Sequence, residues 1–349
     1  MSAVPFAPPP TQTPRKVAVL GAGSWGTALA KLVADKGIST ALWARRPHAA
    51  AAMAQSRENP DYLPGARLPD CLRPTACLDE ALDGAEWVLL VVPTQSMRAF
   101  AKQLVPVLAP TACLISASKG IEQGSLALVS EILTDTLPDA QHPRLAYLAG
   151  PSFAREVADA VPTAVCVASQ TPAVALAAQQ LLSTHSFRVY TSNDVVGVEL
   201  GGALKNVIAI AVGCADGLGL GHNARAALIT RGLAEITRLG VAVGAAPLTF
   251  AGLCGMGDLV LTCTGPLSRN RQVGFALGQG QPLSEVLQRM HMVAEGVATA
   301  ASAMHLAQRH GVDVPIIEQA YRVLHQGHAP ADAIEALLSR PLKAEHDFG

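Results

Sequence analysis

The sequence predicts an α/β fold in which a doubly wound parallel sheet is followed by an all-α C-terminal domain. Short apolar runs alternate with helical or irregular stretches up to about residue 192, as in buried parallel strands joined by crossover helices. Beyond that point, long Ala-, Leu- and Gly-rich helical patterns replace them. A chain of 349 residues is also too long for a single hydrophobic core, which favours two domains. We therefore expect a disordered tail at 1–14, a sheet domain at 15–192 and a helical domain at 193–349.

The strands are predicted from apolar runs that end at glycine, proline or polar residues. Lys16–Leu20 meets a glycine cluster, and residues 27–35 then show the periodicity of a helix. The run at 87–92 is continuous, as in a strand buried on both faces, and Pro93 ends it. The remaining predicted strands are 39–44, 112–116, 145–149, 164–168 and 187–191.

The second domain is predicted from helical periodicity alone, because strand signals nearly vanish after residue 192. Its apolar stretches are long enough for helices that bury much of their surface. The predicted helices are 195–215, 223–239, 283–288, 299–310 and 316–325.

Composition and charge exclude several kinds of protein. With 50% hydrophobic and 15% charged residues, the chain has ample material for a core. A net charge of -1 argues against a nucleic-acid or anionic-membrane partner. Residues 1–14 lack the pattern of a secretory signal, and the longest apolar candidate, 200–214, carries Lys205 and Asn206. We expect a cytoplasmic protein without a stable membrane anchor.

The 7 cysteines are not spaced as CxxC, and most lie in apolar runs. Their odd number and their surroundings favour buried free thiols in a reducing compartment over disulfides. No His/Cys cluster has the spacing of metal ligands, so no metal site is expected.

The motif GAGSWG at residues 21–26 fits GxGxxG and stands between a predicted strand and a predicted helix. Gly21 permits a tight turn, Gly23 lets the backbone approach a pyrophosphate, and Gly26 allows close helix–strand contact. A helix that begins near Ser24 directs free N–H groups and its positive dipole end at the phosphates. The sheet domain is therefore predicted to be a Rossmann-like dinucleotide-binding domain. The alternative is an ordinary glycine turn.

The end of the second predicted strand bears on which dinucleotide is bound. NAD sites usually place Asp or Glu there, whereas this chain has Arg45 and Arg46. Guanidinium groups bind phosphate through forked, charge-assisted hydrogen bonds, so NADP(H) is favoured over NAD(H). In the alternative, one arginine stacks on the adenine and the other is solvated, which would allow both cofactors.

Further segments follow the glycine loop in a specific order and spacing. They are SASKGIE at 116–122, GPSFA at 150–154, ELGGALKN at 199–206, GDL at 257–259 and SRN at 268–270. With residues 21–26, they closely resemble the soluble, NAD(P)-dependent bacterial glycerol-3-phosphate dehydrogenases, from about Lys16 to Leu338. The resemblance implies interconversion of dihydroxyacetone phosphate and sn-glycerol 3-phosphate with NAD(P)H, in support of phospholipid synthesis. It also implies a homodimer.

The resemblance implies roles for individual residues, of which Lys205 matches the catalytic lysine. The positions that match substrate contacts are Lys119, Gly150, Ser152, Lys205, Asp258, Ser268, Arg269 and Asn270. Beside the three glycines of the loop, the positions that match cofactor contacts are Ser24, Trp25, Arg45, Arg46, Lys119, Ala154, Arg269, Val293 and Glu295.

Lys205 can also be interpreted without the resemblance. It lies in the apolar stretch 195–215, whose only other charge is Glu199, so this helix should be buried. Burial lowers the pKa of an ammonium group, and a lysine near neutrality can act as general acid or base. While charged, it would stabilise a developing alkoxide. The alternative is a lysine whose ammonium group reaches solvent.

The other candidates have structural alternatives too. Lys119 follows a predicted strand at the carboxyl edge of the sheet, where ligands bind, or it is a solvated loop lysine. Asp258 fixes Lys205 or binds a substrate hydroxyl, or it caps a helix. The segment 268–270 suits phosphate oxygens, or it begins a capped helix. For Glu295, the resemblance implies hydrogen bonds near the nicotinamide end of the cofactor, and the alternative is an ordinary surface glutamate.

Two other functions compete with the one that the resemblance implies. A hydroxyacid or ketopantoate-type reductase also joins a nucleotide domain to a helical one, but it is not expected to combine Lys119, Lys205 and the SRN segment. A non-catalytic NADPH-binding sensor would keep the glycine loop but lose the lysine and the phosphate clamp, both of which this chain retains. The sequence assigns no role to His222, Arg271 or residues 1–14.

Overall fold

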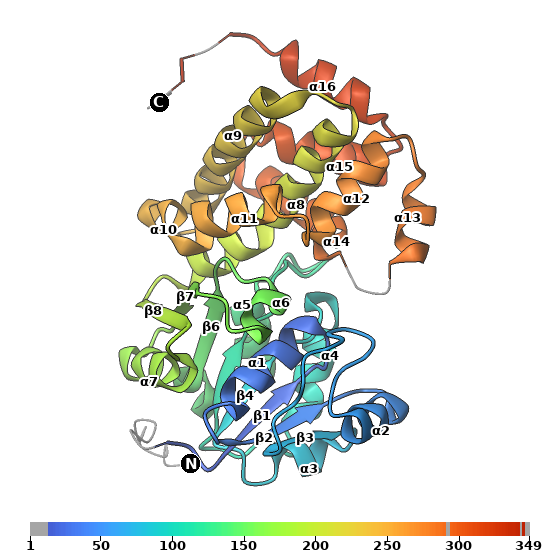
Figure 1. Cartoon of the computed structure of the whole chain (residues 1–349). Coiled ribbons are helices and arrows are strands. Elements are labelled where there is room, and N and C mark those ends of the chain that lie inside the picture. Colours follow the sequence, from blue (N-terminus) through green and yellow to red (C-terminus); the bar gives the residue numbers. More distant parts are fainter. Residues whose placement is uncertain (1–12, 291–293, 343, 346–349) are drawn as a thin grey trace.

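The computed structural model describes residues 13–290, 294–342 and 344–345 (Figure 1). The predicted tail at 1–14, apart from Thr13 and Pro14, lies outside the described residues, and so does the cofactor candidate Val293. The chain forms a sheet domain, drawn blue to green in Figure 1, and a helical domain, drawn yellow to red.

Within the described residues, the sheet domain contains one sheet of eight strands in the order β3-β2-β1-β4-β5-β6-β7-β8. The strands from β3 to β6 in this order run parallel, and the winding reverses between β1 and β4. In open α/β sheets, ligands bind beyond the carboxyl ends of the strands at such a reversal. The strands are β1 (Lys16–Leu20), β2 (Ser39–Trp43), β3 (Leu72–Thr75), β4 (Trp87–Leu90), β5 (Cys113–Ser116), β6 (Leu145–Ala149), β7 (Thr163–Ala168) and β8 (Phe187–Ser192).

The predicted fold class is confirmed, with one departure from the expected parallel sheet. β7 pairs antiparallel with β6, and β8 runs parallel with β7, so these two strands oppose the rest. An apolar run indicates that a strand is buried but does not encode its direction. The sequence interpretation also missed β3, because this short edge strand contains Arg73 and Pro74 and has no apolar run.

Helices cover both faces of the sheet (Figure 1). α1, α2, α6 and α7 share a hydrophobic cluster with one face, whereas α3, α4 and α5 share a cluster with the other. The helices are α1 (Ser24–Ala34), α2 (Pro47–Ser56), α3 (Leu78–Leu82), α4 (Thr94–Leu104), α5 (Val129–Thr136), η1 (Asp139–Arg144), α6 (Ala154–Ala158) and α7 (Pro172–Leu182).

The helical domain is built around the central helix α8 (Val195–Gly217). α8 and α12 approach closely because glycines face the opposite backbone: a Cβ on Gly213 would lie 2.2 Å from the carbonyl oxygen of Arg271. The other helices are α9 (Gly221–Ala242), α10 (Pro247–Ala251), η2 (Leu253–Gly257), α11 (Asp258–Thr264), α12 (Arg269–Gly278), α13 (Leu283–Arg289), α14 (Glu295–His310), α15 (Pro315–His325) and α16 (Pro330–Leu338).

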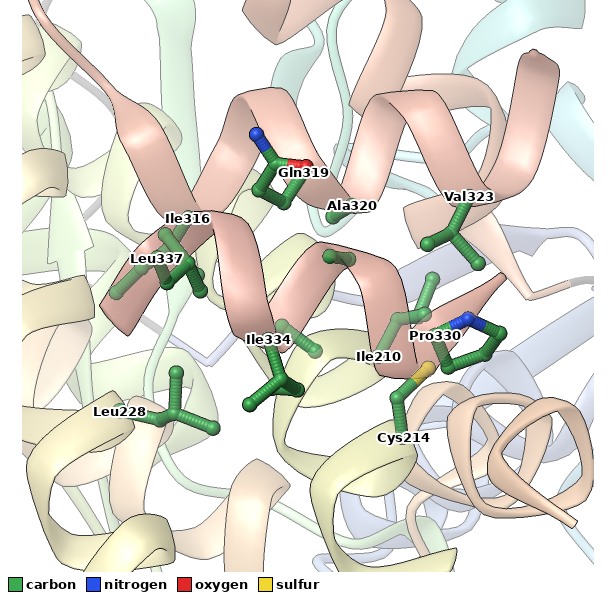
Figure 2. Close-up of a pocket in the computed structure, with 12 residues that line it drawn as sticks. Ile210, Cys214, Leu228, Ile316, Gln319, Ala320, Val323, Pro330, Ile334 and Leu337 are labelled. Atoms are coloured by element: carbon green, nitrogen blue, oxygen red, sulfur yellow. The ribbon is translucent and has the colours of Figure 1, made fainter. Parts of the chain in front are cut away.

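α8 is, among the described residues, the one helix long and apolar enough to cross a membrane by length and composition. Its most apolar window is 83% buried inside the protein, as expected of a core helix. Figure 2 shows an apolar pocket between α8, α9, α15 and α16, lined by residues such as Ile210, Leu228 and Ile334. None of its lining residues is charged, so this pocket is not suited to acid–base chemistry.

Candidate active site

A cluster of charges joins two lysines to one aspartate. Asp258 Oδ1 accepts a hydrogen bond from Lys205 Nζ at 2.5 Å, and its Oδ2 accepts one from Lys119 Nζ at 2.9 Å. Lys205 Nζ also donates to Thr262 Oγ1 at 2.8 Å. One carboxylate therefore orients two ammonium groups, and the fully ionised cluster carries a net positive charge.

The three charged residues come from distant parts of the chain. Lys119 follows β5 in the sheet domain, Lys205 lies in the middle of α8, and Asp258 is the first residue of α11. The turn η2 that leads to Asp258 is π-helical, a rare geometry that often occurs at functional sites. The cluster therefore spans the junction between the two domains.

Burial makes the electrostatics of this cluster strong. The exposed fraction of the side chain is 1% for Asp258, 7% for Lys205 and 18% for Lys119. Burial lowers the pKa of Lys205 to about 8, and repulsion from Lys119 adds to this while attraction to Asp258 opposes it. Burial alone would raise the pKa of Asp258, but the charges and hydrogen bonds of the two lysines hold it below its usual value. The structure thus excludes a Lys205 that reaches solvent.

Gly150 and Ser152 lie at the carboxyl end of β6, beside Lys119. The Gly150 carbonyl oxygen accepts hydrogen bonds from Lys119 Nζ at 3.3 Å and from Ser152 Oγ at 3.0 Å. Gly150 has a φ of +135°, and a Cβ there would lie 2.8 Å from the Cα of Val165. Both the backbone conformation and the close contact require glycine at this position.

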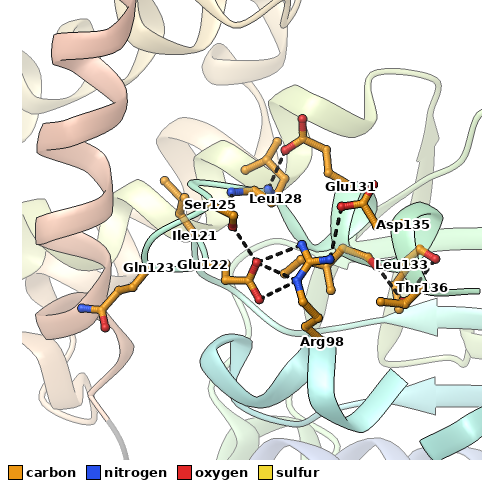
Figure 3. Close-up of polar contacts among 12 residues, drawn as sticks. Arg98, Ile121, Glu122, Gln123, Ser125, Leu128, Glu131, Leu133, Asp135 and Thr136 are labelled. Carbon is orange, nitrogen blue, oxygen red and sulfur yellow. Dashed lines mark hydrogen bonds and ion pairs between the residues drawn. The ribbon is translucent and has the colours of Figure 1, made fainter. Parts of the chain in front are cut away.

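The loop that carries Lys119 is anchored by the polar contacts in Figure 3. Arg98 of α4 forms ion pairs with Glu122 at 2.9 Å and with Asp135 of α5 at 3.2 Å. Ser125 Oγ donates to Glu122 at 2.5 Å. Because the loop is fixed just beyond Lys119, this lysine is held at the end of the sheet and is not a freely solvated side chain.

The SRN segment begins α12. Ser268 is the N-cap, and its Oγ accepts a hydrogen bond from the Arg271 backbone N–H at 3.3 Å. Asn270 Nδ2 donates to Asn206 Oδ1 at 2.9 Å, and Asn270 Oδ1 accepts from the Gly296 N–H at 3.0 Å. The helix-capping alternative thus describes Ser268, while Asn270 places the start of α12 beside the residue that follows Lys205.

Glu295 begins α14 and contacts the sheet domain. Its Oε1 accepts a hydrogen bond from the Thr94 N–H at 3.2 Å, and a Cβ on Gly120 would lie 2.6 Å from its Oε2. Burial raises the pKa of Glu295 to about 7, although the bonds with Thr94 and the charge of Arg269 oppose the rise. Glu295 is therefore an inter-domain contact and not an ordinary surface glutamate.

The three glycines of the predicted dinucleotide loop have different surroundings. Gly21 has a φ of +121°, and a Cβ there would lie 2.3 Å from the carbonyl oxygen of Val91. A Cβ on Gly26 would lie 1.8 Å from the carbonyl oxygen of Gly21. A Cβ on Gly23 would meet nothing within 4 Å. Packing of the protein thus explains Gly21 and Gly26, whereas Gly23 borders open space in which a ligand fits.

The start of α1 fits a nicotinamide dinucleotide. Gly23 is the N-cap of α1 and has no side chain, so the N-cap residue itself offers no acceptor to the first N–H groups of the helix. The indole Nε1 of Trp25 is buried without a hydrogen-bond partner among the described residues. Ala154, another predicted cofactor contact, begins α6 and packs against the same hydrophobic cluster as Trp25. The loop thus combines a helix N-terminus beside open space with a buried indole N–H that has no partner among the described residues.

Arg45 and Arg46 follow β2 and are both exposed. Arg46 already forms an ion pair with Asp61 at 3.2 Å, and its guanidinium carbon lies 5.9 Å from the centre of the Tyr62 ring. No partner of the Arg45 side chain is found in the described part of the chain. The two arginines are therefore not equivalent, and Arg45 is the one available to a ligand.

Sequence reasoning missed three polar residues of this region. Thr262 binds Lys205, Asn206 binds Asn270, and the Thr94 N–H binds Glu295. Thr262 lies four residues after Asp258 in the same helix, so helical spacing alone could have suggested it. The contacts of Asn206 and Thr94 join different secondary-structure elements, so no local sequence pattern predicts them.

The metal and cysteine predictions can be compared with the structure residue by residue. Among the described residues, no group of three or more His, Cys, Asp or Glu side chains is placed to hold a metal ion. All seven cysteines are free, as expected. The expectation that they are buried is wrong for Cys77, which is exposed, and for Cys71 and Cys166, which are half-buried. Cys71 and Cys77 flank the edge strand β3, which has no apolar run, whereas Cys166 lies within the apolar run of β7 and is still only half-buried.

Two family profiles match the chain. The profile for the NAD-dependent glycerol-3-phosphate dehydrogenase N-terminus matches residues 16–175, and the one for the C-terminus matches residues 194–335. The chain belongs to the NAD-dependent glycerol-3-phosphate dehydrogenase family. The candidate site lies where these two matched regions meet, because Lys119 comes from the first region and Lys205 and Asp258 come from the second.

Members of this family resemble the chain over nearly its whole length. A glycerol-3-phosphate dehydrogenase (NAD(P)+) of Geobacter sp. (strain M21) is 57% identical over 330 residues, which are 95% of this chain and 98% of that protein. The crystal structure of glycerol-3-phosphate dehydrogenase from Coxiella burnetii is 40% identical, covers 95% of this chain and 100% of that one, and has a TM-score of 0.90.

A ketopantoate reductase from Ralstonia eutropha JMP134 shares the fold alone. It is 16% identical, covers 91% of this chain and 99% of that one, and has a TM-score of 0.57. The family resemblance expected from the sequence motifs is thus confirmed, and the chain is an NAD(P)-dependent dehydrogenase.

Proposed function

We propose that this chain interconverts dihydroxyacetone phosphate and sn-glycerol 3-phosphate by hydride transfer with NAD(P)H, supplying glycerol 3-phosphate for phospholipid synthesis. The observation that carries the proposal is the bridge that Asp258 makes between Lys205 and Lys119 at the domain junction. Two oriented ammonium groups suit a substrate that bears a phosphate and develops an alkoxide. Membership of the family supports the same reaction.

Lys205 is the proposed acid–base residue. When bound, the nicotinamide supplies or accepts the hydride. In reduction, the ammonium group of Lys205 donates a proton to the substrate oxygen, and in oxidation its neutral amine takes the hydroxyl proton. A pKa of about 8 makes both forms accessible near neutral pH. Asp258 and Thr262 orient Nζ through hydrogen bonds of 2.5 and 2.8 Å, so no reorganisation is needed during reaction.

The substrate phosphate is proposed to bind between the loop of Lys119 and the start of α12. Arg269 lies at the first turn of α12, where the helix dipole also favours an anion, and burial lowers the pKa of its guanidinium group. The proposed substrate contacts are Lys119, Gly150, Ser152, Lys205, Asp258, Ser268, Arg269 and Asn270.

The cofactor is proposed to bind the sheet domain, which we delimit at residues 15–192, with the substrate domain at 193–349. The open space beside Gly23 and the unpartnered Trp25 Nε1 support this placement. Apart from the loop glycines, the proposed contacts among the described residues are Ser24, Trp25, Arg45, Arg46, Lys119, Ala154, Arg269 and Glu295.

We propose that NADP(H) is preferred and that Arg45 determines the preference. Arg45 is exposed after β2, where a 2′-phosphate would be expected, whereas Arg46 is engaged by Asp61. An unengaged guanidinium group can bind that phosphate without first breaking an ion pair.

We also propose that the chain works as a homodimer in the cytoplasm. Val241 of α9 is 46% exposed and Leu248 of α10 is 84% exposed, which supports an apolar contact surface on these neighbouring helices. Free thiols support a reducing compartment. Light scattering on the purified chain should give twice the mass of one chain, and a monomer at all concentrations would contradict the dimer.

The decisive experiment measures initial rates with dihydroxyacetone phosphate, using NADPH and NADH side by side. We expect turnover with both cofactors and a higher kcat/KM with NADPH. Ketopantoate is the matched control substrate, because reductases that share only the fold act on it. Oxidation of NADPH with ketopantoate but not with dihydroxyacetone phosphate would refute the proposed function.

A further inference from the structure

A second buried aspartate of the helical domain also joins two basic residues. Asp216 lies in the last turn of α8, about three helical turns beyond Lys205. Its Oδ1 lies 2.8 Å from Arg225 Nε and 2.7 Å from Arg225 Nη2. Its Oδ2 lies 2.8 Å from Arg271 Nε and 2.7 Å from Arg271 Nη2. Because two nitrogens of each guanidinium group donate to one oxygen, these contacts fix the direction of each arginine as well as its distance.

The stability of the separate helices does not account for these charges. Asp216 lies near the C-terminus of α8, and Arg271 is the third residue of α12. The helix dipole disfavours a carboxylate at a C-terminus and a cation at an N-terminus. The side chains of Asp216 and Arg271 are only 4% and 21% exposed, so water screens their attraction weakly. The ion pair therefore offsets two unfavourable placements and joins α8 directly to α12.

Glycines line the close contacts between α8 and α12. A Cβ on Gly274 would lie 2.0 Å from the carbonyl oxygen of Ile210, as a Cβ on Gly213 would lie 2.2 Å from that of Arg271. Packed helices usually set their relative position by fitting side-chain ridges into grooves, and a glycine supplies no ridge. Backbone lies against backbone at these contacts, so polar contacts are needed to fix how α12 lies along α8.

Two polar contacts at the start of α12 supply this restraint. Asn270 Nδ2 donates to Asn206 Oδ1 at 2.9 Å, and the next residue, Arg271, binds Asp216. These consecutive residues reach α8 at positions almost three helical turns apart. Together they fix both the position and the rotation of the first turn of α12, which contains Arg269.

We propose that Arg271, held by Asp216, is a positioning residue for the substrate phosphate. It acts through Arg269, which the proposed function assigns to the phosphate, and this inference rests on that assignment. Asp216 and Lys205 lie on the same helix, so the ion pair sets the distance between the proton donor and the phosphate site. A three-carbon substrate with its phosphate at one end requires this distance to be fixed.

The first test compares Arg271→Ala with Arg225→Ala in initial rates with dihydroxyacetone phosphate at saturating NADPH. In Arg271→Ala, the KM for dihydroxyacetone phosphate should rise roughly tenfold or more, because α12 loses one of its two restraints. Its kcat should stay within about threefold of the wild-type value, because Lys205 and Asp258 are untouched.

Arg225→Ala is the matched control. It removes the other ion pair of the same aspartate, and the side chain of Arg225 is 26% exposed, close to the 21% of Arg271. Arg225 belongs to α9 and not to α12, so its loss should leave the KM for dihydroxyacetone phosphate within about threefold of the wild-type value. Urea unfolding of both variants measures their stability independently of activity.

Asp216→Ala separates positioning from direct contact with the substrate. This variant keeps the guanidinium group of Arg271 but removes the carboxylate that holds it, so KM should rise as in Arg271→Ala. Adding Arg271→Ala to Asp216→Ala should then change KM by less than about twofold, because both changes remove the same restraint. If Arg271 bound the phosphate itself, its loss would raise KM further.

Equal KM values in Arg271→Ala and Arg225→Ala would overturn the proposal, and so would a loss confined to kcat. Additive effects on KM in the double variant would also overturn it, because Arg271 would then act without Asp216. Failure of the proposed function would appear separately, as a wild-type chain that does not turn over dihydroxyacetone phosphate.

Discussion

The two halves of the candidate site use different chemical groups. The sheet domain offers backbone groups in six consecutive residues, with Gly21 and Gly26 required by packing and Gly23 open to a ligand. The helical domain offers buried ionisable side chains, above all Lys205 and Asp258. This difference shows which kind of site can be predicted from sequence. A site made of backbone groups comes from one contiguous segment, whereas a cluster of charged side chains depends on the whole fold.

The largest effect is expected at the helical half, from Lys205→Ala. This change removes the proposed proton donor, so kcat should fall by roughly 10²- to 10⁴-fold. The affinity for NADPH, measured by fluorescence titration, should stay within about twofold of the wild-type value because the glycine loop is untouched. Unchanged turnover in this variant would refute the role of Lys205.

A matched pair of variants in the glycine loop separates the packing role of Gly26 from the ligand-binding role of Gly23. Gly26→Ala places a Cβ 1.8 Å from a carbonyl oxygen, so the free energy of unfolding should fall by roughly 1–3 kcal/mol or more. Gly23→Ala meets open space, and its φ of -76° suits alanine, so stability should change by less than ~0.5 kcal/mol.

Gly23→Ala should nevertheless weaken cofactor binding by roughly tenfold or more, because the methyl group occupies the space that the pyrophosphate needs. Denaturant unfolding and NADPH titration of both variants separate the two effects. If Gly23→Ala bound NADPH like the wild type, the open space beside Gly23 would not be the pyrophosphate site.

A third effect tests how the helical domain tolerates its buried charges. Glu235 accepts hydrogen bonds from the Ile316 and Ile317 N–H groups at the start of α15. Burial raises its pKa from 4.5 to about 7, although these bonds oppose the rise. The folded state therefore holds this proton more tightly than the unfolded state, so the contribution of Glu235 to stability falls as pH rises from 4.5 to about 7.

The glutamine of Glu235→Gln stays neutral at every pH. Between pH 4.5 and about 7, the free energy of unfolding should therefore fall by roughly 2 kcal/mol less in the variant than in the wild type. Urea unfolding of the wild type and the variant at about pH 5 and about pH 8 measures the difference. Parallel pH dependence of the two proteins would show that Glu235 is ionised in the fold throughout.

The smallest effect is expected from Arg45→Ala. Loss of one guanidinium–phosphate contact should raise the Kd of NADPH roughly tenfold and leave that of NADH nearly unchanged. Arg46→Ala is the control. It should change the ratio of the NADPH and NADH Kd values less, because Arg46 forms an ion pair with Asp61. If Arg45→Ala lost the same affinity for NADPH and NADH, Arg45 would not be the residue that determines the cofactor preference.

How much the sequence could predict follows the same division. The glycine loop was readable because its strand, turn and helix are contiguous. The Lys205–Asp258 and Lys119–Asp258 contacts span 53 and 139 residues, and only the resemblance to a family linked them beforehand. The capping role of Ser268 and the ion pair of Arg46 depend on neighbours brought by the fold. The reversed direction of β7 has no local signal at all.

The central claim is that a buried Lys205 with a lowered pKa moves the proton. The most direct test measures kcat against pH in both directions at saturating substrates. Reduction needs the ammonium form, so its kcat should fall as pH rises through about 8, and oxidation needs the neutral amine, so its kcat should rise through about 8. Profiles that are flat, or that change in the same direction for both reactions, would contradict the account.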